Sequence, residues 1–261
     1  MTNQVNCYDV PQYWDLAFSD DTQLEAEFVV AAAKKYCDFP AVRLYEPGCG
    51  GGRLVVELAG RGFQVTGVDQ SRSAVEFTRQ TLTDRGLNAE IVVGDMREPL
   101  TDAEFDVAYC LVNTFRHLLT EEDAKQHLES VHRMLRPGGL YIIGLHLLPP
   151  DADEEDEEDW SVETPDVTVH MQLVAADCDR ARRQETLRFS MTANVVGTAE
   201  PICHSSNYRM RLYEATHVRQ LLASVPGFEL VDVFDFWYDI DDPLELSDEL
   251  GDTVLVLRKT V

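Results

Sequence analysis

The spacing of apolar and polar positions switches repeatedly along the chain. Apolar runs rich in Val, Ile, Leu and Tyr alternate with segments in which apolar residues recur at helical spacing. This alternation is typical of a parallel sheet with helices on both faces. It predicts strands at 41–46, 64–68, 89–93, 104–110 and 139–146, and helices at 22–36, 52–60, 71–85, 121–135 and 214–224.

The last part of the chain holds two apolar segments with no helical segment between them. "FELVDVFDF" (228–236) and "DTVLVLRKT" (252–260) are joined by an acidic loop. Strands without an intervening helix can pair antiparallel as a hairpin. Added to the five strands above, they predict an α/β fold with a doubly wound, mostly parallel sheet of seven strands.

Residues 149–213 form an insertion after the fifth predicted strand. It opens with "PPDADEEDEEDW" (149–160), a charge run that favours a solvated linker. Three segments of alternating apolar and polar residues follow, at 166–177, 185–196 and 207–213. They predict a three-stranded antiparallel sheet lying over the main domain.

Charge and cysteine content narrow the possible partners. The chain has 47 acidic and 22 basic residues and a net charge of −25, which argues against nucleic acid and anionic membrane as partners. Its six cysteines include no C-x-x-C pair, and its histidines show no metal-ligand spacing, so neither a disulfide framework nor a metal site is expected. Without a long apolar run or a signal peptide, the protein is expected to be cytoplasmic.

A glycine-rich loop follows the first predicted strand. Gly48, Gly50 and Gly52 stand directly before a helix, so bare amides meet a helix N-terminus where a ligand can approach the backbone. The second strand ends in Asp69, whose carboxylate can accept hydrogen bonds from a ribose diol. Together these features predict a nucleoside site at the carboxyl edge of the sheet.

The details of the loop distinguish between nucleoside ligands. Arg53 stands where the dinucleotide fingerprint G-x-G-x-x-G has its third glycine. Glu46 precedes the glycines, and its charge would repel a pyrophosphate but suits an ammonium or sulfonium group. Asp95, after the third strand, can accept from the exocyclic amine of adenine, while Met96 offers an amide and an apolar wall.

These motifs, taken in order, resemble the class I S-adenosylmethionine-dependent methyltransferases. The matching elements are "EPGCGGG" (46–52), "VTGVDQS" (65–71), "GDM" (94–96), "FDVAYCLVNTFRHL" (105–118) and "MLRPGGLYIIGLH" (134–146). The resemblance implies S-adenosylmethionine as cofactor and S-adenosylhomocysteine as product. It implies that Glu46 contacts the methionyl amine or steers the loop, and that Gly48 and Gly50 line the cofactor. It also implies that Asp69 holds the ribose and that Asp95 and Met96 frame the adenine. The expected cofactor-binding residues are Tyr13, Glu46, Gly48, Cys49, Gly50, Asp69, Gln70, Asp95, Met96, Cys110 and Leu111.

Methyl transfer is an in-line displacement, so the protein must bring a nucleophile to the methyl group and exclude water. Asn113 and His117, after the fourth strand, are the catalytic candidates: Asn113 as a polar contact and His117 as a general base, with a structural role as its alternative. Arg116, Arg211 and Tyr213 are the candidates for binding the acceptor. Arginines of the insertion suit a carboxylate or phosphate, unless they pair with nearby acids.

The expected organisation follows from these assignments. Residues 1–40 form an arm and helix that act as a lid, in which Tyr8 or Tyr13 reaches the methionyl carboxylate or merely anchors the arm. Residues 41–148 bind the cofactor, 149–213 cover the substrate or form a homodimer interface, and 214–261 complete the core. The expected function is methyl transfer to an unidentified small molecule. The alternatives are a nicotinamide-dependent oxidoreductase and a non-catalytic, cofactor-binding regulatory subunit.

Overall fold

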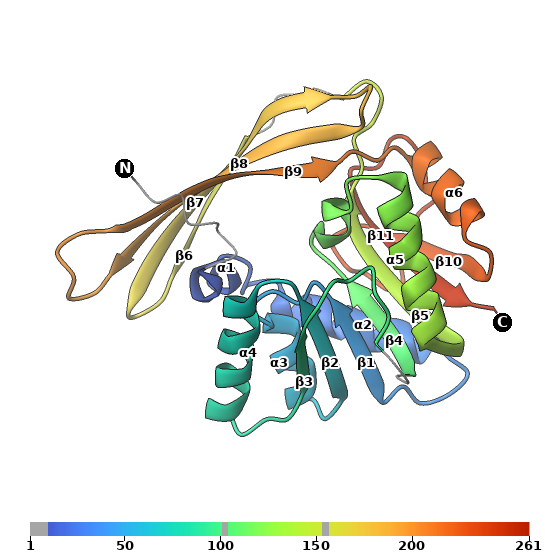
Figure 1. Ribbon diagram of the computed structural model, residues 1–261, viewed down its shortest axis with the longest axis horizontal. Coiled ribbons are helices and arrows are strands. Elements are labelled where there is room, and N and C mark those ends of the chain that lie inside the picture. Colours follow the sequence, from blue (N-terminus) through green and yellow to red (C-terminus); the bar gives the residue numbers. More distant parts are fainter. Residues whose placement is uncertain (1–9, 101–103, 153–156, 261) are drawn as a thin grey trace.

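The computed structural model describes residues 10–100, 104–152 and 157–260 and contains two sheets (Figure 1). The larger sheet has seven strands in the order β10-β11-β5-β4-β1-β2-β3. Only β11 runs antiparallel to β5 and to its hairpin partner β10. The fold class expected from the sequence is therefore confirmed. The strands are β1 Arg43–Pro47, β2 Gln64–Asp69, β3 Glu90–Val93, β4 Phe105–Cys110, β5 Leu135–His146, β10 Phe228–Phe234 and β11 Asp252–Lys259.

All five predicted helices are present, and their ends lie within one residue of the prediction. Side-chain caps explain two of the starts: Ser71 Oγ accepts from Ala74 N (3.2 Å), and Thr120 Oγ1 accepts from Asp123 N (3.1 Å). Two short helices were not predicted, α1 Pro11–Ala17 and the 3₁₀ helix η2 Thr114–His117. The predicted helices are α2 Thr22–Tyr36, α3 Arg53–Gly60, α4 Arg72–Asp84, α5 Glu121–Met134 and α6 Ala215–Ser224.

The core has two layers, one on each face of the large sheet. Alternation along β5 shows why: Leu140 and Ile142 pack with α2, α3 and α4, whereas Tyr141, Ile143 and Leu145 pack with α5 and α6. The helices therefore bury both faces and leave the carboxyl ends of the parallel strands as the place where loops gather. This edge is where ligands bind in open α/β sheets.

The start of β5 differs most from the prediction, whereas the other strand ends of the large sheet lie within two residues of it. The strand was expected to start at residue 139, after a helix ending at residue 135. Instead α5 ends at Met134 and β5 begins at once with Leu135, which pairs with Phe105 of β4. The strand tolerates the irregularity because Gly138 adopts a left-handed φ of 77°.

The insertion forms a four-stranded antiparallel sheet, in the order β6-β7-β8-β9, rather than the three strands expected. The additional strand, β6, comes from the end of the acidic run, where Trp160 pairs with Met171 and Val162 with Val169. The prediction of a linker, which was based on charge, is therefore wrong for residues 157–160. Residues 153–156 of the acidic run lie outside the described residues. The strands are β6 Glu157–Glu163, β7 Val167–Asp179, β8 Gln184–Val195 and β9 Ile202–Arg211.

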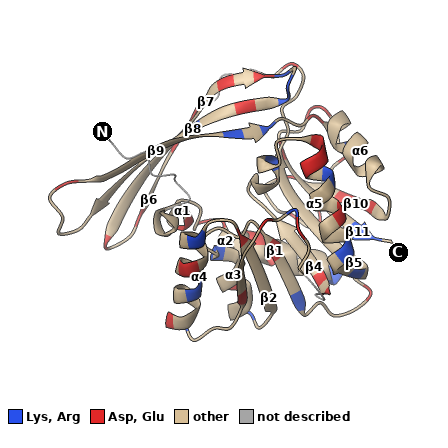
Figure 2. Cartoon of the chain, viewed as in Figure 1, with Lys and Arg blue, Asp and Glu red and all other residues tan. Residues whose placement is uncertain are grey.

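Two arginines fix the near end of this sheet above the carboxyl edge of the core. Arg116 of η2 donates to the carbonyl of Arg211 (2.9 Å) and forms an ion pair with Glu185 of β8. Arg211 of β9 in turn donates to the carbonyl of Leu119 (3.1 Å) and forms an ion pair with Glu121 at the start of α5 (2.5 Å). Figure 2 shows the basic end of β9 near the acidic start of α5. Both arginines are almost fully buried. The insertion is therefore attached to the core and arches over it.

Among the described residues, no helix is both long and apolar enough to cross a membrane.

Another buried ion pair joins α2 to α3 next to the glycine loop. Arg53 Nη2 lies 2.9 Å and 2.7 Å from the two carboxylate oxygens of Glu25, and the two side chains are 16% and 2% exposed. Taking both charges out of water is costly, so the pair matters to stability mainly because losing one partner would leave the other buried and unpaired.

We predict that Arg53→Met lowers the free energy of unfolding by about 3 kcal/mol, because Glu25 is left as an unpaired buried carboxylate. Urea denaturation followed by circular dichroism measures this. The matched control is Arg61→Met, which removes a more exposed pair with Glu57 (2.8 Å) and is expected to cost less than about 1 kcal/mol. Equal losses in the two variants would contradict the structural role given to Arg53.

Candidate functional site

The glycine loop, residues 48–52, connects β1 to α3. Gly48 and Gly50 have φ of 69° and 55°. A Cβ at Gly48 would overlap the Thr114 side chain, so this glycine is required by packing inside the protein. At Gly50, by contrast, nothing lies within 4 Å of where a Cβ would be. Gly50 is thus the position at which the backbone faces open space and a ligand can approach it.

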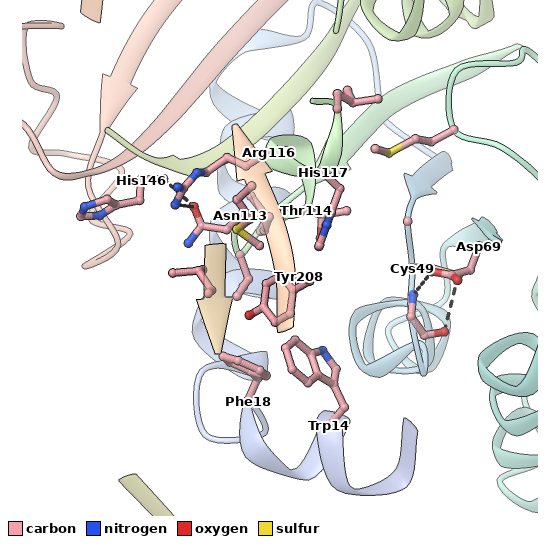
Figure 3. Close-up of a pocket in the computed structure, with 18 of the residues that line it drawn as sticks. Trp14, Phe18, Cys49, Asp69, Asn113, Thr114, Arg116, His117, His146 and Tyr208 are labelled. Atoms are coloured by element: carbon pink, nitrogen blue, oxygen red, sulfur yellow. Dashed lines mark hydrogen bonds between the residues drawn. The ribbon is translucent and has the colours of Figure 1, made fainter. Parts of the chain in front are cut away.

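Asp69, at the end of β2, organises this loop (Figure 3). Its Oδ2 accepts from Gly50 N (2.8 Å) and its Oδ1 accepts from Ser71 N (2.7 Å). Burial raises the pKa of Asp69, while these amide donors oppose the rise. Each carboxylate oxygen has a second lone pair, so Asp69 can hold the loop and still accept from a diol.

Glu46 is an acid buried inside the cavity wall. Its side chain is only 8% exposed, and its Oε2 has no hydrogen-bond partner among the described residues. Burial raises the pKa of Glu46 well above its usual range, while the charge of Arg53 and a hydrogen bond with the Tyr109 hydroxyl lower it. A buried carboxyl in the wall of the cavity suits a ligand that carries a positive, hydrogen-bonding group.

Asp95 and Met96, which follow β3, are each fixed by a polar contact. Asp95 pairs with Arg97 (2.6 Å), which lowers the pKa of Asp95, and Arg97 also pairs with Asp123 of α5 (2.5 Å). Burial lowers the pKa of His127 to about 4, so the ring is neutral. Its Nδ1 donates to the carbonyl of Met96 (2.7 Å), because a carbonyl only accepts, and its Nε2 accepts from the hydroxyl of Tyr141 (2.6 Å). His127 therefore positions Met96 without lining the cavity.

The segment after β4 brings Asn113 and His117 to the cavity. Asn113 has a left-handed φ of 64°, and its Oδ1 accepts from His146 N (2.6 Å), which ties the end of β4 to that of β5. His117 lines the cavity, with its ring centre 5.7 Å from that of Tyr208. Burial, with the neighbouring charge of Arg116, lowers the pKa of His117 to about 4. The imidazole is therefore neutral and can accept a hydrogen bond.

The roof of the cavity is the inner face of the four-stranded sheet, which meets the helix α1. This face is mostly apolar and includes aromatic rings. The side chains of Trp14, in α1, and Phe18, which follows α1, also line the cavity (Figure 3). The roof residues that line the cavity are Glu158, Trp160, Leu173, Ala175, Cys178, Glu185, Leu187, Tyr208, Met210 and Leu212.

The cavity has a volume of about 1210 Å³. Pockets for single small ligands are typically about 300–1,000 Å³, so there is room here for two molecules. Ten carboxylic acids and three arginines line it. Each arginine is already paired with a lining acid: Arg53 with Glu25, Arg97 with Asp95, and Arg116 with Glu185. The cavity therefore favours neutral or positively charged ligands over anions.

Most residues predicted for the site do line this cavity. They are Glu46, Gly48, Cys49, Gly50, Asp69, Gln70, Asp95, Met96, Leu111, Asn113, Arg116 and His117.

Four predicted residues lie elsewhere. Tyr13 packs against the apolar cluster between α1 and the inserted sheet, and Cys110 points into the core because it alternates with Leu111. Arg211 and Tyr213 are buried at the junction of sheet and core. Arg188 and Arg209, also considered for acceptor binding, are exposed on the outer face of the sheet. The placement of these arginines does not support their expected role in binding an anionic acceptor.

Apolar and aromatic residues of the inserted sheet that line the cavity were not predicted as site residues. A signal for them was in the sequence, because Leu187 and Tyr208, paired across β8 and β9, fall on the apolar positions of the predicted strands. Apolar positions of a strand are usually assigned to core packing, whereas Leu187 and Tyr208 line the cavity. Tyr8 lies outside the described residues.

Part of the chain is similar in sequence to known methyltransferase domains. Residues 45–139 match the model of a methyltransferase domain family. A putative methyltransferase of Geobacillus sp. (strain WCH70) is 28% identical over 53% of this chain and 57% of its own length. The chain spans about half the length of the curated relatives it matches.

Solved structures resemble nearly the whole chain. An S-adenosylmethionine-dependent methyltransferase from Clostridium acetobutylicum ATCC 824 superposes with a TM-score of 0.77 at 15% identity, covering 98% of this chain and 100% of that one. The sugar N-methyltransferase KedS8 from Streptoalloteichus sp. gives 0.74 at 18% identity, covering 95% and 93%. At these identities the likeness establishes the fold, inserted sheet included.

We predict that Asp69→Asn weakens binding of S-adenosylhomocysteine by about 1–3 kcal/mol. The asparagine amide has one acceptor oxygen where the carboxylate has two, so it cannot hold both backbone N–H groups and also accept from the ribose diol. Isothermal titration calorimetry measures the affinity. Asp84→Asn, on the exposed end of α4, is the control and should bind normally. Wild-type affinity in the Asp69 variant would remove this residue from the site.

Proposed function

We propose that this chain is a class I S-adenosylmethionine-dependent methyltransferase that transfers a methyl group to an amine of a small molecule. The match of residues 45–139 to a methyltransferase domain family and the shared fold support this proposal. The cofactor supplies a methyl group on a positively charged sulfur. The acceptor nitrogen forms a bond to the methyl carbon as the carbon–sulfur bond breaks, with the electron pair going to sulfur and a proton leaving the amine for solvent. The protein's task is to place the two reactants in line and exclude water.

One observation carries the proposal: the loop with its acids and the inner face of the inserted sheet line a single cavity. The loop side fits the cofactor, because Gly50 opens its backbone to the cavity and Glu46 places a buried carboxyl in the cavity wall. The roof side remains for the acceptor. Between them stands His117, the neutral imidazole at the end of η2.

The charge of the lining supports an amine rather than a carboxylate or phosphate. Every lining arginine is already neutralised by a lining acid, so none is left to bind an anion. The aromatic rings of Trp14, Trp160 and Tyr208 suit the apolar body or the positive charge of an amine. The neighbour named as a sugar N-methyltransferase supports a nitrogen acceptor.

His117 orients the amine rather than removing its proton. With a pKa of about 4, a neutral imidazole is a weak base but a good hydrogen-bond acceptor. By accepting from an N–H of the acceptor, it turns the nitrogen lone pair towards the methyl group. This replaces the general-base role expected from the sequence.

The proposal is tested by incubating the protein with S-adenosylmethionine and matched pools of amines, alcohols and carboxylic acids, and measuring formation of S-adenosylhomocysteine. Turnover with the amine pool supports it, and turnover with the carboxylic acid pool alone contradicts it. Calorimetry with S-adenosylhomocysteine and NADH separates it from the oxidoreductase alternative. Cofactor binding with no turnover on any pool would favour the regulatory subunit.

We predict that His117→Ala lowers kcat by about 5- to 150-fold, the equivalent of about 1–3 kcal/mol for a lost hydrogen bond, and leaves cofactor affinity unchanged. His170→Gln, on the outer face of the sheet, is the control. In the wild type, the neutral acceptor form of His117 is lost only as pH falls through about 4, so a pH–rate profile should lack an inflection near 6.5. A His117-dependent inflection there would contradict the assigned state.

A further inference from the structure

A histidine and an aspartate form a pair at the carboxyl edge of the large sheet. His146 is the last residue of β5 and Asp252 is the first of the antiparallel β11, and the two are opposite each other in the strand register. His146 Nδ1 lies 3.1 Å from Asp252 Oδ1, and both residues line the cavity. Because a carboxylate only accepts, Nδ1 donates this bond, and in the neutral ring Nε2 is left with a lone pair. The pair therefore offers a ligand two places that accept hydrogen bonds, Nε2 and the second oxygen of Asp252.

This pair lies on the far side of β4 from the glycine loop. The strand order is β11-β5-β4-β1-β2, so Asp252 and Asp69 stand on opposite sides of β4. Figure 3 agrees, because Asn113 lies between His146 and His117. The ring of His146 points away from His117 in this view. The pair is therefore placed to bind a part of the methyl acceptor other than the nitrogen that reacts.

Apolar side chains line the cavity on the same side. Val112, Leu148 and Phe236 follow β4, β5 and β10, three strands that end at this edge of the sheet. The ring of Phe236 stacks on that of Tyr238, with centres 5.8 Å apart and planes 3° from parallel. Such a lining suits the methylene groups that join two polar ends of a small ligand.

An acidic cavity does not favour the reactive form of an amine. The attacking nitrogen needs a free lone pair, so it is uncharged, whereas an acid beside it favours the protonated form. Asp252 is 54% exposed and, among the residues that the structure describes, forms no ion pair with an arginine or lysine. It starts two strands away from β4, at a distance of roughly 10 Å. Asp252 can therefore attract a cation without holding a proton on the reacting nitrogen.

We propose that the methyl acceptor is a diamine, and that Asp252 and His146 bind the ammonium group that is not being methylated. The proposal rests on the proposed function, since it names the class of amine. An ammonium group has three N–H donors, and the pair can accept two of them. A hydroxyl group has one donor and no charge, and a carboxylate would be repelled by Asp252. His117 thus binds one end of the diamine, and the pair binds the other.

The test compares three amines of equal chain length: hexane-1,6-diamine, 6-aminohexan-1-ol and hexylamine. Formation of S-adenosylhomocysteine at varied amine concentration gives kcat/KM for each, and the series is repeated with shorter and longer chains. For the wild type we expect kcat/KM of the best diamine, corrected for its two reactive ends, to exceed those of its matched amino alcohol and monoamine by about 5- to 10-fold. The difference should lie mostly in KM, because the second ammonium group is bound equally before and during methyl transfer.

The variant Asp252→Asn tests the pair itself. It keeps the size of the side chain but removes the charge, so the preference for the diamine should fall to less than about twofold. The matched control is Asp248→Asn, an exposed residue in the loop before β11, which changes the net charge equally and should keep the preference. Loss of folded protein would lower the rates with all three amines and leave their ratio unchanged.

Equal kcat/KM for diamine and monoamine in the wild type, at every chain length, overturns the proposal. A preference that survives in Asp252→Asn also overturns it, as does an amino alcohol that matches the diamine, since the pair would then bind a hydroxyl group. Turnover with alcohols or carboxylic acids but with none of the amines is a different result. It contradicts the proposed function itself, and the diamine proposal falls with it.

Discussion

The site depends on one constraint: the amides of the glycine loop are held by carboxylates from outside the loop. Asp69 accepts from Gly50 and Ser71, and Asp15 accepts from Gly51 and Arg53. The donors exist because a tight turn before α3 leaves backbone N–H groups without helical partners. The acids that satisfy them are buried, and burial raises the pKa of both Asp15 and Asp69 because their charged forms lose water. The arrangement that fixes the backbone therefore also makes ionisation of these carboxyls costly, a cost that a nearby positive charge would offset.

The space for the acceptor depends on a second set of charges. Arg116 and Arg211 join η2, β8, β9 and the start of α5, and this junction holds the inserted sheet above the carboxyl edge of the core. Because both arginines are neutralised in these ion pairs, neither is left to bind an anion in the cavity. The same ion pairs that attach the sheet therefore also leave a cavity lining that disfavours anions.

The sequence predicted the core well and the roof less well, for physical reasons. Periodicity located all five long helices because helical spacing is a local signal. The motifs led to the resemblance to methyltransferases, which the match of residues 45–139 to a methyltransferase domain family supports, and the solved structures share the fold. The strand β6 was missed because its pairing with β7 outweighs its charge. Arg211 follows the alternative that the sequence left open, pairing with an acid, but its partner Glu121 could not be named because it lies far away in the sequence. The contact between Asp15 and Gly51 has no local signal in either segment.

The methyltransferase family match ends at residue 139, whereas the inserted sheet that forms the roof begins at β6. A chain carrying a different sheet after the matched segment would therefore keep the residues of that segment unchanged. Such a chimera must retain the contacts that seat the sheet, among them Arg116 with Glu185, Arg211 with Glu121, and the bond from Trp160 Nε1 to the carbonyl of Ala17. The boundary after residue 139 is thus the natural place to exchange the cavity roof while leaving its floor in place.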